Sequence, residues 1–384
     1  MVKQDGHIYF RGLNGLRFFA AIAVVITHIE LIKYQCGFSN IWKENMLVFE
    51  LGSLGVIFFF VLSGFLITYL LMQEKEVKET VAVKKFYIRR ILRIWPMYYL
   101  VVLLGFLVLP HIHVIDNPYL NKFLNSNFAP NFTLYLLFLP NLAFAAYAAV
   151  PHIGQTWSIG VEEQFYLLWP LIVKHSKNVL KALVMVIGIL IVLKVIVLVL
   201  YKQSPDNTTL KIIKPFLAMT KMESMAIGGI GAYFLFKGSE KLKWLMNNGM
   251  MISSLIMIVL LVYFTPSFIQ DAIYLVYSVL FLVIILNVSS NPNSILKLEN
   301  RAFKMLGNIS YGIYMYHLIV IAFVFAGLNY MGMQIDDSFM SQLIVYSSTI
   351  VLTVFVSVLS YSYFEKPFLN LKHKFTIIKS GSNN

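Results

Sequence analysis

Apolar stretches about as long as a membrane-spanning helix recur along the whole chain. A helix needs about 20 mainly apolar residues to cross the hydrocarbon core of a bilayer. Ten stretches approach or exceed that length, at residues 13–32, 51–71, 94–110, 157–173, 180–201, 216–236, 250–264, 268–288, 303–328 and 340–364. The pattern predicts an all-α fold, a polytopic membrane bundle of about ten transmembrane helices.

One further apolar stretch, residues 132–150, is broken by Pro140 and Asn141. If it crossed the membrane, every later loop would change sides, so the charges of the loops decide the topology. With ten spans and both termini in the cytoplasm, 22 of the 31 Lys and Arg residues lie in inner segments and 6 in outer segments. Inner loops of membrane proteins are enriched in these residues. We therefore interpret residues 132–150 as re-entrant or surface-lying.

Composition supports a lipid environment. Hydrophobic residues make up 59% of the 384 residues and charged residues only 13%, whereas a soluble domain carries about 25% charged residues. The net charge of +13 is explained by Lys and Arg residues in the predicted inner loops, as the positive-inside rule requires. We therefore expect no nucleic-acid partner. The single cysteine, Cys36, excludes a disulfide within the chain and a multi-cysteine metal site. We expect no metal and no tightly bound cofactor.

Two ionisable residues lie inside the first predicted span, where burial is costly and function is the default interpretation. Arg17 and His28 are 11 residues apart, which is about three helical turns, so both project from one face about 16 Å apart along the axis. We predict that both are catalytic. The alternative is that Arg17 reaches the inner headgroups and His28 lies near the outer surface.

A polar motif begins the fourth predicted span. Its Glu162 and Glu163 are adjacent, and Ser158, Glu162 and Tyr166 follow one helical row. We predict that either carboxylate orients a histidine base or binds substrate. Helix N-termini also favour negative charge, which is the alternative. Trp157, Ser158 and Tyr166 complete the motif as candidate substrate-binding residues.

Three arginines lie on one broad side of the third predicted span, at its cytoplasmic end: Arg89, Arg90 and Arg93. Guanidinium groups bind phosphate in a bidentate manner, so the cluster is a candidate site for a phosphate-bearing substrate. Anchoring to anionic lipids is an equally good interpretation.

A second histidine lies well inside the ninth predicted span. His317 follows Tyr314 by three residues, which places the two on adjacent faces of a helix. Both are candidate substrate-binding residues. A core histidine satisfied by a tyrosine hydroxyl is the slightly favoured alternative for His317.

Taken in order along the chain, these motifs resemble the membrane acyltransferase-3 family, bacterial integral-membrane O-acyltransferases that modify glycans. The matching segments are Leu13-Asn14-Gly15-Leu16-Arg17 with His28, residues 59–67 (FFVLSGFLI), residues 89–93 (RRILR), Trp157-Ser158 with residues 162–167 (EEQFYL), residues 310–314 (SYGIY) with His317, and residues 364–367 (FEKP).

The resemblance implies that the chain is an O-acyltransferase. It implies about ten spans, cytoplasmic acyl-CoA (acetyl-CoA in the simplest case) as donor, a hydroxyl of a glycan or glycolipid as acceptor, and functional roles for Arg17 and His28. It also implies a membrane acyltransferase domain over residues 1–366, a short cytoplasmic tail over 367–384, the stand-alone form without an esterase-like domain, and location in the bacterial cytoplasmic membrane. The acceptor and the oligomeric state stay open.

The resulting hypothesis assigns His28 as the base toward the acceptor hydroxyl, Glu162 or Glu163 as its partner, and the arginines as the grip on donor phosphates. The acyl group travels either on the thioester or on a residue that is acylated first. A secondary transporter of a small solute is the rival, because such carriers also need ionisable groups inside the membrane. They usually show repeats or broken helices in matching halves, and no repeat is evident. A non-catalytic scaffold leaves Arg17 and His28 unexplained.

Overall fold

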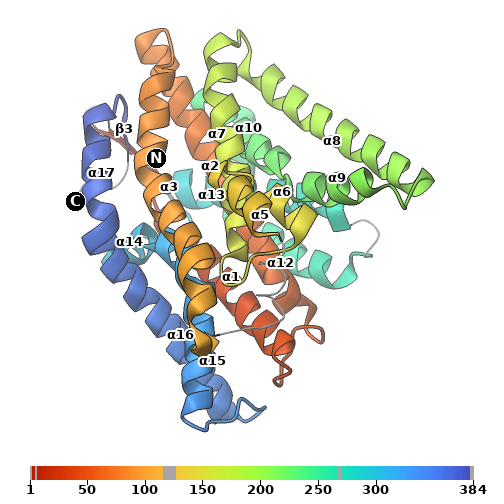
Figure 1. Cartoon of the computed structure of the whole chain (residues 1–384). Coiled ribbons are helices and arrows are strands. Elements are labelled where there is room, and N and C mark those ends of the chain that lie inside the picture. The colour runs from red at the N-terminus through yellow and green to blue at the C-terminus, as the bar shows by residue number, and fades with distance from the viewer. Residues whose placement is uncertain (1, 5–6, 116–126, 267–269, 381–384) are drawn as a thin grey trace.

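The computed structural model describes residues 2–4, 7–115, 127–266 and 270–380. These residues form a helix bundle (Figure 1), so the predicted all-α membrane fold is confirmed. The helices are α1 (Leu13–Gln35), α2 (Met46–Lys78), α3 (Val83–Leu103), α5 (Phe128–Leu136), α6 (Pro140–Tyr147), α7 (Trp157–His175), α8 (Val179–Gln203), α9 (Thr208–Met219), α10 (Met222–Phe236), α11 (Glu240–Leu245), α12 (Asn248–Phe264), α13 (Gln270–Ser290), α14 (Arg301–Asn308), α15 (Ser310–Tyr330), α16 (Phe339–Ser360) and α17 (Lys366–Lys372).

Seven helical segments in the described part of the chain are long and apolar enough to cross a membrane, so the count of ten is not confirmed. Of the other three predicted spans, 157–173 lies in α7, and 250–264 lies in the shorter apolar helix α12. The third, 216–236, is interrupted between α9 and α10. Residue 268, where another predicted span starts, lies outside the described residues.

The break between α9 and α10 has a physical cause. α9 buries none of its residues, whereas α10 is buried along most of its length. At the junction, Lys221 lies 4.1 Å from the centre of the Tyr274 ring, and Lys194 of α8 pairs with Glu223. Residues 216–236 read as one apolar stretch because hydropathy alone does not show which residues are buried. In the structure this stretch joins the end of an exposed helix to a buried one.

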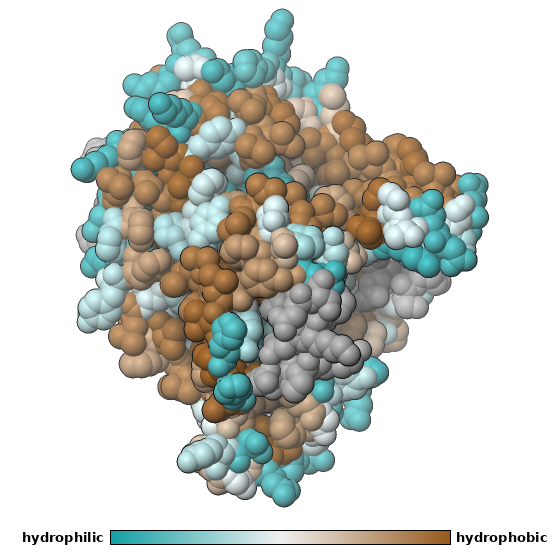
Figure 2. Space-filling model, viewed as in Figure 1, coloured by the Kyte–Doolittle hydropathy of each residue, from teal (hydrophilic) through white to brown (hydrophobic). Residues whose placement is uncertain are grey.

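Hydrophobic residues cover most of the visible face in Figure 2, and hydrophilic residues gather at its upper edge and lower end. Helix α8 lies along one side of the bundle (Figure 1), and only Val179 and Leu183 of its 25 residues are buried. A helix that is apolar all round and yet uncovered by protein requires lipid as its surroundings. The surface therefore fits a bilayer.

The two segments of the 132–150 region form short helices, α5 and α6, neither of which has the length of a span. Asn131, Tyr135 and Asn141 are buried against the bundle. Irregular backbone at membrane depth is tolerated where protein covers it. The arrangement fits the predicted re-entrant or surface-lying segment.

A small sheet, which the all-α prediction did not include, joins the two ends of the described chain. Strands β1 (Val2–Gln4) and β2 (His7–Tyr9) are antiparallel, and β3 (Lys379–Ser380) adds to β2 in parallel. Part of the predicted tail is therefore held against the N-terminal segment. Next to the sheet, Glu299 accepts hydrogen bonds from the Gly12 amide at 2.7 Å and from the Tyr9 hydroxyl, which fixes the start of α1.

Helices α2 and α10 approach each other closely, with glycines that face the backbone of the partner helix. A Cβ atom on Gly64 would lie 1.9 Å from the carbonyl oxygen of Met225, and one on Gly228 would lie 2.0 Å from that of Val61. Small residues permit such contact between membrane helices. Gly64 and Gly228 thus let the two helices meet backbone to backbone.

We predict that Gly64→Ala destabilises the protein by about 1–3 kcal/mol, because the added methyl group must push two backbones apart. Thermal unfolding of the purified protein measures the change. Gly188→Ala on α8 is the matched control, because its Cβ would meet nothing within 4 Å. Equal melting temperatures for the two variants would contradict the packing described.

Candidate active site

Two histidines from distant parts of the chain meet inside the bundle. His28 of α1 and His317 of α15 approach at 3.2 Å, between Nδ1 of His28 and Nε2 of His317. Nδ1 of His28 also lies 2.9 Å from the carbonyl oxygen of Val24, and Nδ1 of His317 lies 2.7 Å from that of Tyr314. His317 is fully buried. Its partners are a histidine and a backbone carbonyl, not the tyrosine hydroxyl that the favoured alternative expected.

These contacts assign the hydrogens of both rings. A carbonyl oxygen can only accept, so the ring nitrogen beside it carries a hydrogen, and a neutral imidazole carries only one. Each histidine is therefore protonated on Nδ1 when neutral. His28 shares its Nδ1 hydrogen between Val24 and the lone pair on Nε2 of His317. The unprotonated nitrogen of His28 is then Nε2, which is the form a general base needs.

A cavity of about 480 Å³ adjoins His28. Its aromatic lining comprises Trp42, Phe49, Trp157, Tyr274 and Tyr314, and its polar lining comprises Thr27, His28, Glu50, Ser53 and Gln155. Walls that combine aromatic and aliphatic side chains with a few polar groups are typical of small-molecule sites, and the volume lies in their usual range of about 300–1,000 Å³. The cavity is large enough for a sugar ring.

Gln155 supplies a vacant acceptor at the cavity wall. Its Nε2 donates to the carbonyl oxygen of Met315 at 2.7 Å, while its buried Oε1 has no hydrogen-bond partner within the described residues. A buried polar atom without a partner is costly. Because the atom is buried, the Gln155 side chain must rotate before a ligand hydroxyl in the cavity can reach it.

Ser158 and Tyr314, predicted as substrate-binding residues, contact each other beside the cavity. Their hydroxyl oxygens are 2.7 Å apart, and the Tyr314 hydroxyl also donates to the carbonyl oxygen of Gln155 at 3.0 Å. Trp157 lies in the cavity wall. The structure therefore gathers Trp157, Ser158, Tyr314 and both histidines at one centre.

A second, basic centre forms near the start of α1. Arg17 donates to Asn14 at 3.0 Å and interacts electrostatically with Arg93, Tyr166, Arg90 and Glu162. The Arg90 guanidinium lies 5.4 Å and 5.5 Å from the centres of the Phe86 and Tyr166 rings. Nε of Arg90 is buried without a hydrogen-bond partner within the described residues. Such a cluster of cations suits an anionic ligand.

The remaining predicted residues are placed differently. Arg89 contacts Glu74 at 3.3 Å and the carbonyl oxygen of Phe375 at 2.9 Å, so it is engaged in structural contacts. Glu163 accepts from the Trp95 indole at 2.9 Å, and Glu162 lies in the basic centre. The hydrogen-bond partners of His28 are Val24 and His317 rather than either carboxylate.

Sequence reasoning assigned no role to several residues of the two centres, although Glu365 lies in the 364–367 motif. Lys372 of α17 lies within electrostatic range of Arg93, Arg90, Arg89 and Arg17, and Glu365 interacts with Arg93. Glu365 ends a π-helical turn, Tyr361–Glu365, and such turns often mark functional sites. Glu50 is a buried carboxylate in the cavity wall. Its position directly before the second predicted span, 51–71, was the available signal.

Within the described residues, a histidine with one ring nitrogen left for chemistry lines a cavity inside a membrane bundle, and a separate cation cluster lies near the start of the same helix; together they define an integral membrane enzyme. The family described as "Acyltransferase domain" matches residues 10–362. The chain therefore belongs to the membrane acyltransferase-3 family, as its motifs indicated.

Among curated proteins, the chain is similar to the putative peptidoglycan O-acetyltransferase YrhL of Bacillus subtilis, with 26% identity over 95% of this chain and 56% of that protein. It is 27% identical to the peptidoglycan O-acetyltransferase OatA of Listeria monocytogenes over 82% of this chain and 49% of that protein. A putative O-acetyltransferase of Staphylococcus aureus is 28% identical over 94% of this chain and 57% of its own. The chain thus spans about half the length of these relatives. No solved structure matches.

We predict that diethyl pyrocarbonate modifies His28 at Nε2 and spares His317, because His28 lines the cavity whereas His317 is fully buried. Peptide mass spectrometry locates the modified residues. The exposed His373 is an internal positive control. Modification of His317 at the rate of His28 would contradict the assigned geometry.

Proposed function

We propose that the chain transfers an acyl group, acetyl in the simplest case, from cytoplasmic acyl-CoA to a hydroxyl of a cell-envelope glycan. The observation that carries the proposal is His28 in the lining of the cavity, with its Nδ1 held by Val24 and His317 so that Nε2 is left for the role of base. Family membership supports the reaction class.

The chemistry requires a base, a held donor and an electrophilic carbonyl. Nε2 of His28 takes the proton of the acceptor hydroxyl as its oxygen attacks the acyl carbon. The carbon–sulfur bond then breaks, and the thiolate takes the proton from Nε2 of His28 and leaves as coenzyme A. His28 is an imidazolium in between, and its Nδ1 hydrogen remains bonded to Val24 and to the lone pair of His317. His317 is thus a positioning residue in the place that a carboxylate fills in many hydrolases.

The basic centre is the proposed grip on the donor. Arg17, Arg90, Arg93 and Lys372 interact with one another there. Coenzyme A carries its phosphates at one end and its thioester at the end of an extended arm. Phosphates at the basic centre would leave the arm to run along α1 toward His28, about 16 Å away by helical rise.

Two routes for the acyl group are consistent with this arrangement. The hydroxyl attacks the thioester directly, or a residue between the centres is acylated first and then passes the group on. Ping-pong kinetics would identify the second route, and a trapped ternary complex the first.

The acceptor class rests on the cavity. Sugar rings present C–H faces that pack on aromatic side chains, and their hydroxyl groups would supply the donor that Oε1 of Gln155 lacks. Two of the relatives are named for peptidoglycan, so a peptidoglycan strand is the first acceptor to test. We place the protein in the bacterial cytoplasmic membrane with both termini inside.

We expect His28→Gln to lower kcat for acetyl transfer by about 10²–10⁴, because general base catalysis contributes about that much. The assay supplies labelled acetyl-CoA and a panel of glycans to the purified chain in vesicles. His175→Gln is the matched control, because His175 is exposed at the C-terminal end of α7. Full transfer activity in His28→Gln would refute the catalytic assignment.

We expect Arg90→Lys to raise KM for acetyl-CoA by about tenfold with little change in kcat, because a lysine cannot reproduce bidentate phosphate binding. Acetyl-pantetheine lacks the nucleotide phosphates, so its KM should be the same for variant and wild type. Arg11→Lys, at an exposed position, is the control. An equal loss with both donors would count against phosphate binding by Arg90.

A further inference from the structure

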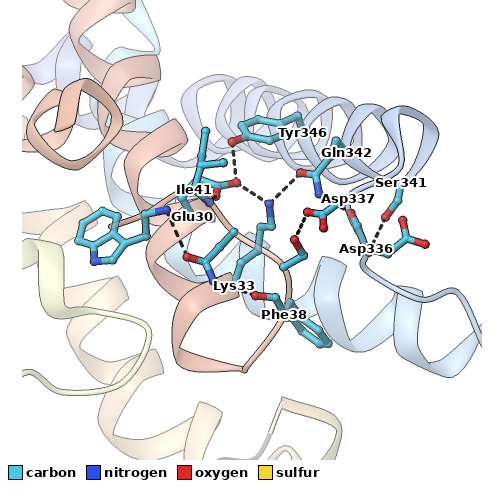
Figure 3. A network of polar contacts seen from close by, with 12 residues as sticks. Glu30, Lys33, Phe38, Ile41, Asp336, Asp337, Ser341, Gln342 and Tyr346 are labelled. Atoms are coloured by element: carbon cyan, nitrogen blue, oxygen red, sulfur yellow. Dashed lines mark hydrogen bonds and ion pairs between the residues drawn. The ribbon is translucent and has the colours of Figure 1, made fainter. Parts of the chain in front are cut away.

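A buried ion pair lies beyond His28 on α1, outside both centres. Lys33 contacts Glu30 at 2.6 Å and Oε1 of Gln342 at 2.7 Å, and the Tyr346 hydroxyl donates to Oε1 of Glu30 at 2.7 Å. Glu30 is 0% exposed and Lys33 is 1% exposed. Figure 3 shows these side chains converging between α1 and α16. Neither charge takes part in the reaction described above.

The second carboxylate oxygen of Glu30 binds the backbone of a neighbouring segment. Its Oε2 accepts the backbone N–H of Ile41 at 2.6 Å, in the connection between α1 and α2 (Figure 3). The same connection is tied down by Phe38, whose ring packs at 5.9 Å on that of Phe325, and by the bond from Ser39 to Asp337. The Glu30 carboxylate, held by its own partners, thus fixes the Ile41 amide in a connection that is otherwise irregular.

The residue after that peptide is Trp42, which lines the cavity together with His28. Its backbone N–H donates to Oδ1 of Asn40 at 3.2 Å, and its ring lies 4.9 Å from that of Phe49, another cavity residue. The indole is therefore held on both sides, by the anchored backbone and by an aromatic neighbour.

Burial of two charges is costly, and an ion pair often gives no net stability over apolar residues of similar volume. A positional role accounts for its presence here. We propose that Glu30 is a positioning residue that, through the Ile41 amide, holds Trp42 as the platform on which the sugar ring of the acceptor stacks. This deepens the proposed function and rests on it for the identity of the acceptor.

The test measures acceptor binding without donor, so that it does not depend on catalysis. The probe is the β-1,4-linked tetramer of N-acetylglucosamine, titrated calorimetrically into the full chain in lipid nanodiscs. We expect Trp42→Ala to weaken binding by at least about tenfold, as expected for loss of a buried aromatic anchor. Trp244→Ala is the matched control, because Trp244 is 69% exposed on α11.

Two double variants separate anchoring from charge. Glu30→Leu/Lys33→Met removes the ion pair and the acceptor for the Ile41 amide without leaving a lone buried charge, and we expect about tenfold weaker binding. Glu30→Gln/Lys33→Met removes the same charges but keeps an oxygen for that amide, and we expect it to restore affinity to within about threefold of wild type. In transfer assays the first variant should raise the acceptor KM more than it lowers kcat.

The outcomes are distinguishable. Equal affinities for the two double variants, or unchanged affinity in Trp42→Ala, would overturn the positioning role, and so would the absence of saturable binding to the wild type. The proposed function is tested separately by the transfer assay, in which full activity of His28→Gln would refute it. Melting temperatures of both double variants check that each is folded. If Glu30→Leu/Lys33→Met does not fold, Tyr346→Phe removes one donor to Glu30 and should raise the acceptor KM by about twofold.

Discussion

A polar group inside hydrocarbon must find its partner within the protein, because no water is present to hydrogen-bond it. Helix α1 meets this constraint three times. Arg17 is matched by Asn14 on its own helix and by Tyr166 and Glu162 on α7, His28 by His317 on α15, and Glu30 by Lys33 and by Tyr346 on α16. Each pairing fixes a different neighbour against α1. The helix that carries the proposed chemistry is therefore also the one against which the surrounding helices are aligned.

Within the part of the chain that the structure describes, helices α2 and α10 are held together by close backbone contact and not by paired polar groups. Gly64 and Gly228 let α2 and α10 touch backbone to backbone, which leaves little freedom for either helix to slide. Dense packing of this kind transmits small displacements. The cavity wall formed by α2, including Glu50 and Ser53, is thereby held at a set distance from His28, as a site that discriminates between acceptors requires.

Local patterns were sufficient to predict the helical membrane fold. They also singled out Trp157, Tyr314 and His28, which the structure places in the cavity wall, because each stands out as a polar or amphipathic group in an apolar span. They were insufficient for contacts between distant segments. His28 and His317 are 289 residues apart, and no periodicity relates them. Lys372 lay in a predicted tail, and the pairing of that tail with β2 brings α17 back to the basic centre. The count of spans failed at 216–236, where a break depends on tertiary contacts of Lys221 and Glu223.

The parallel pairing of His7 with Lys379 has a consequence for biogenesis. A ribosome releases the first of these residues long before it makes the second, so β2 must stay unpaired while all the intervening helices enter the bilayer. The imidazole of His28 likewise gains its ring partner only when α15 arrives. A half-inserted chain has neither contact, so the proposed catalytic base is assembled only after α15 has entered the bilayer.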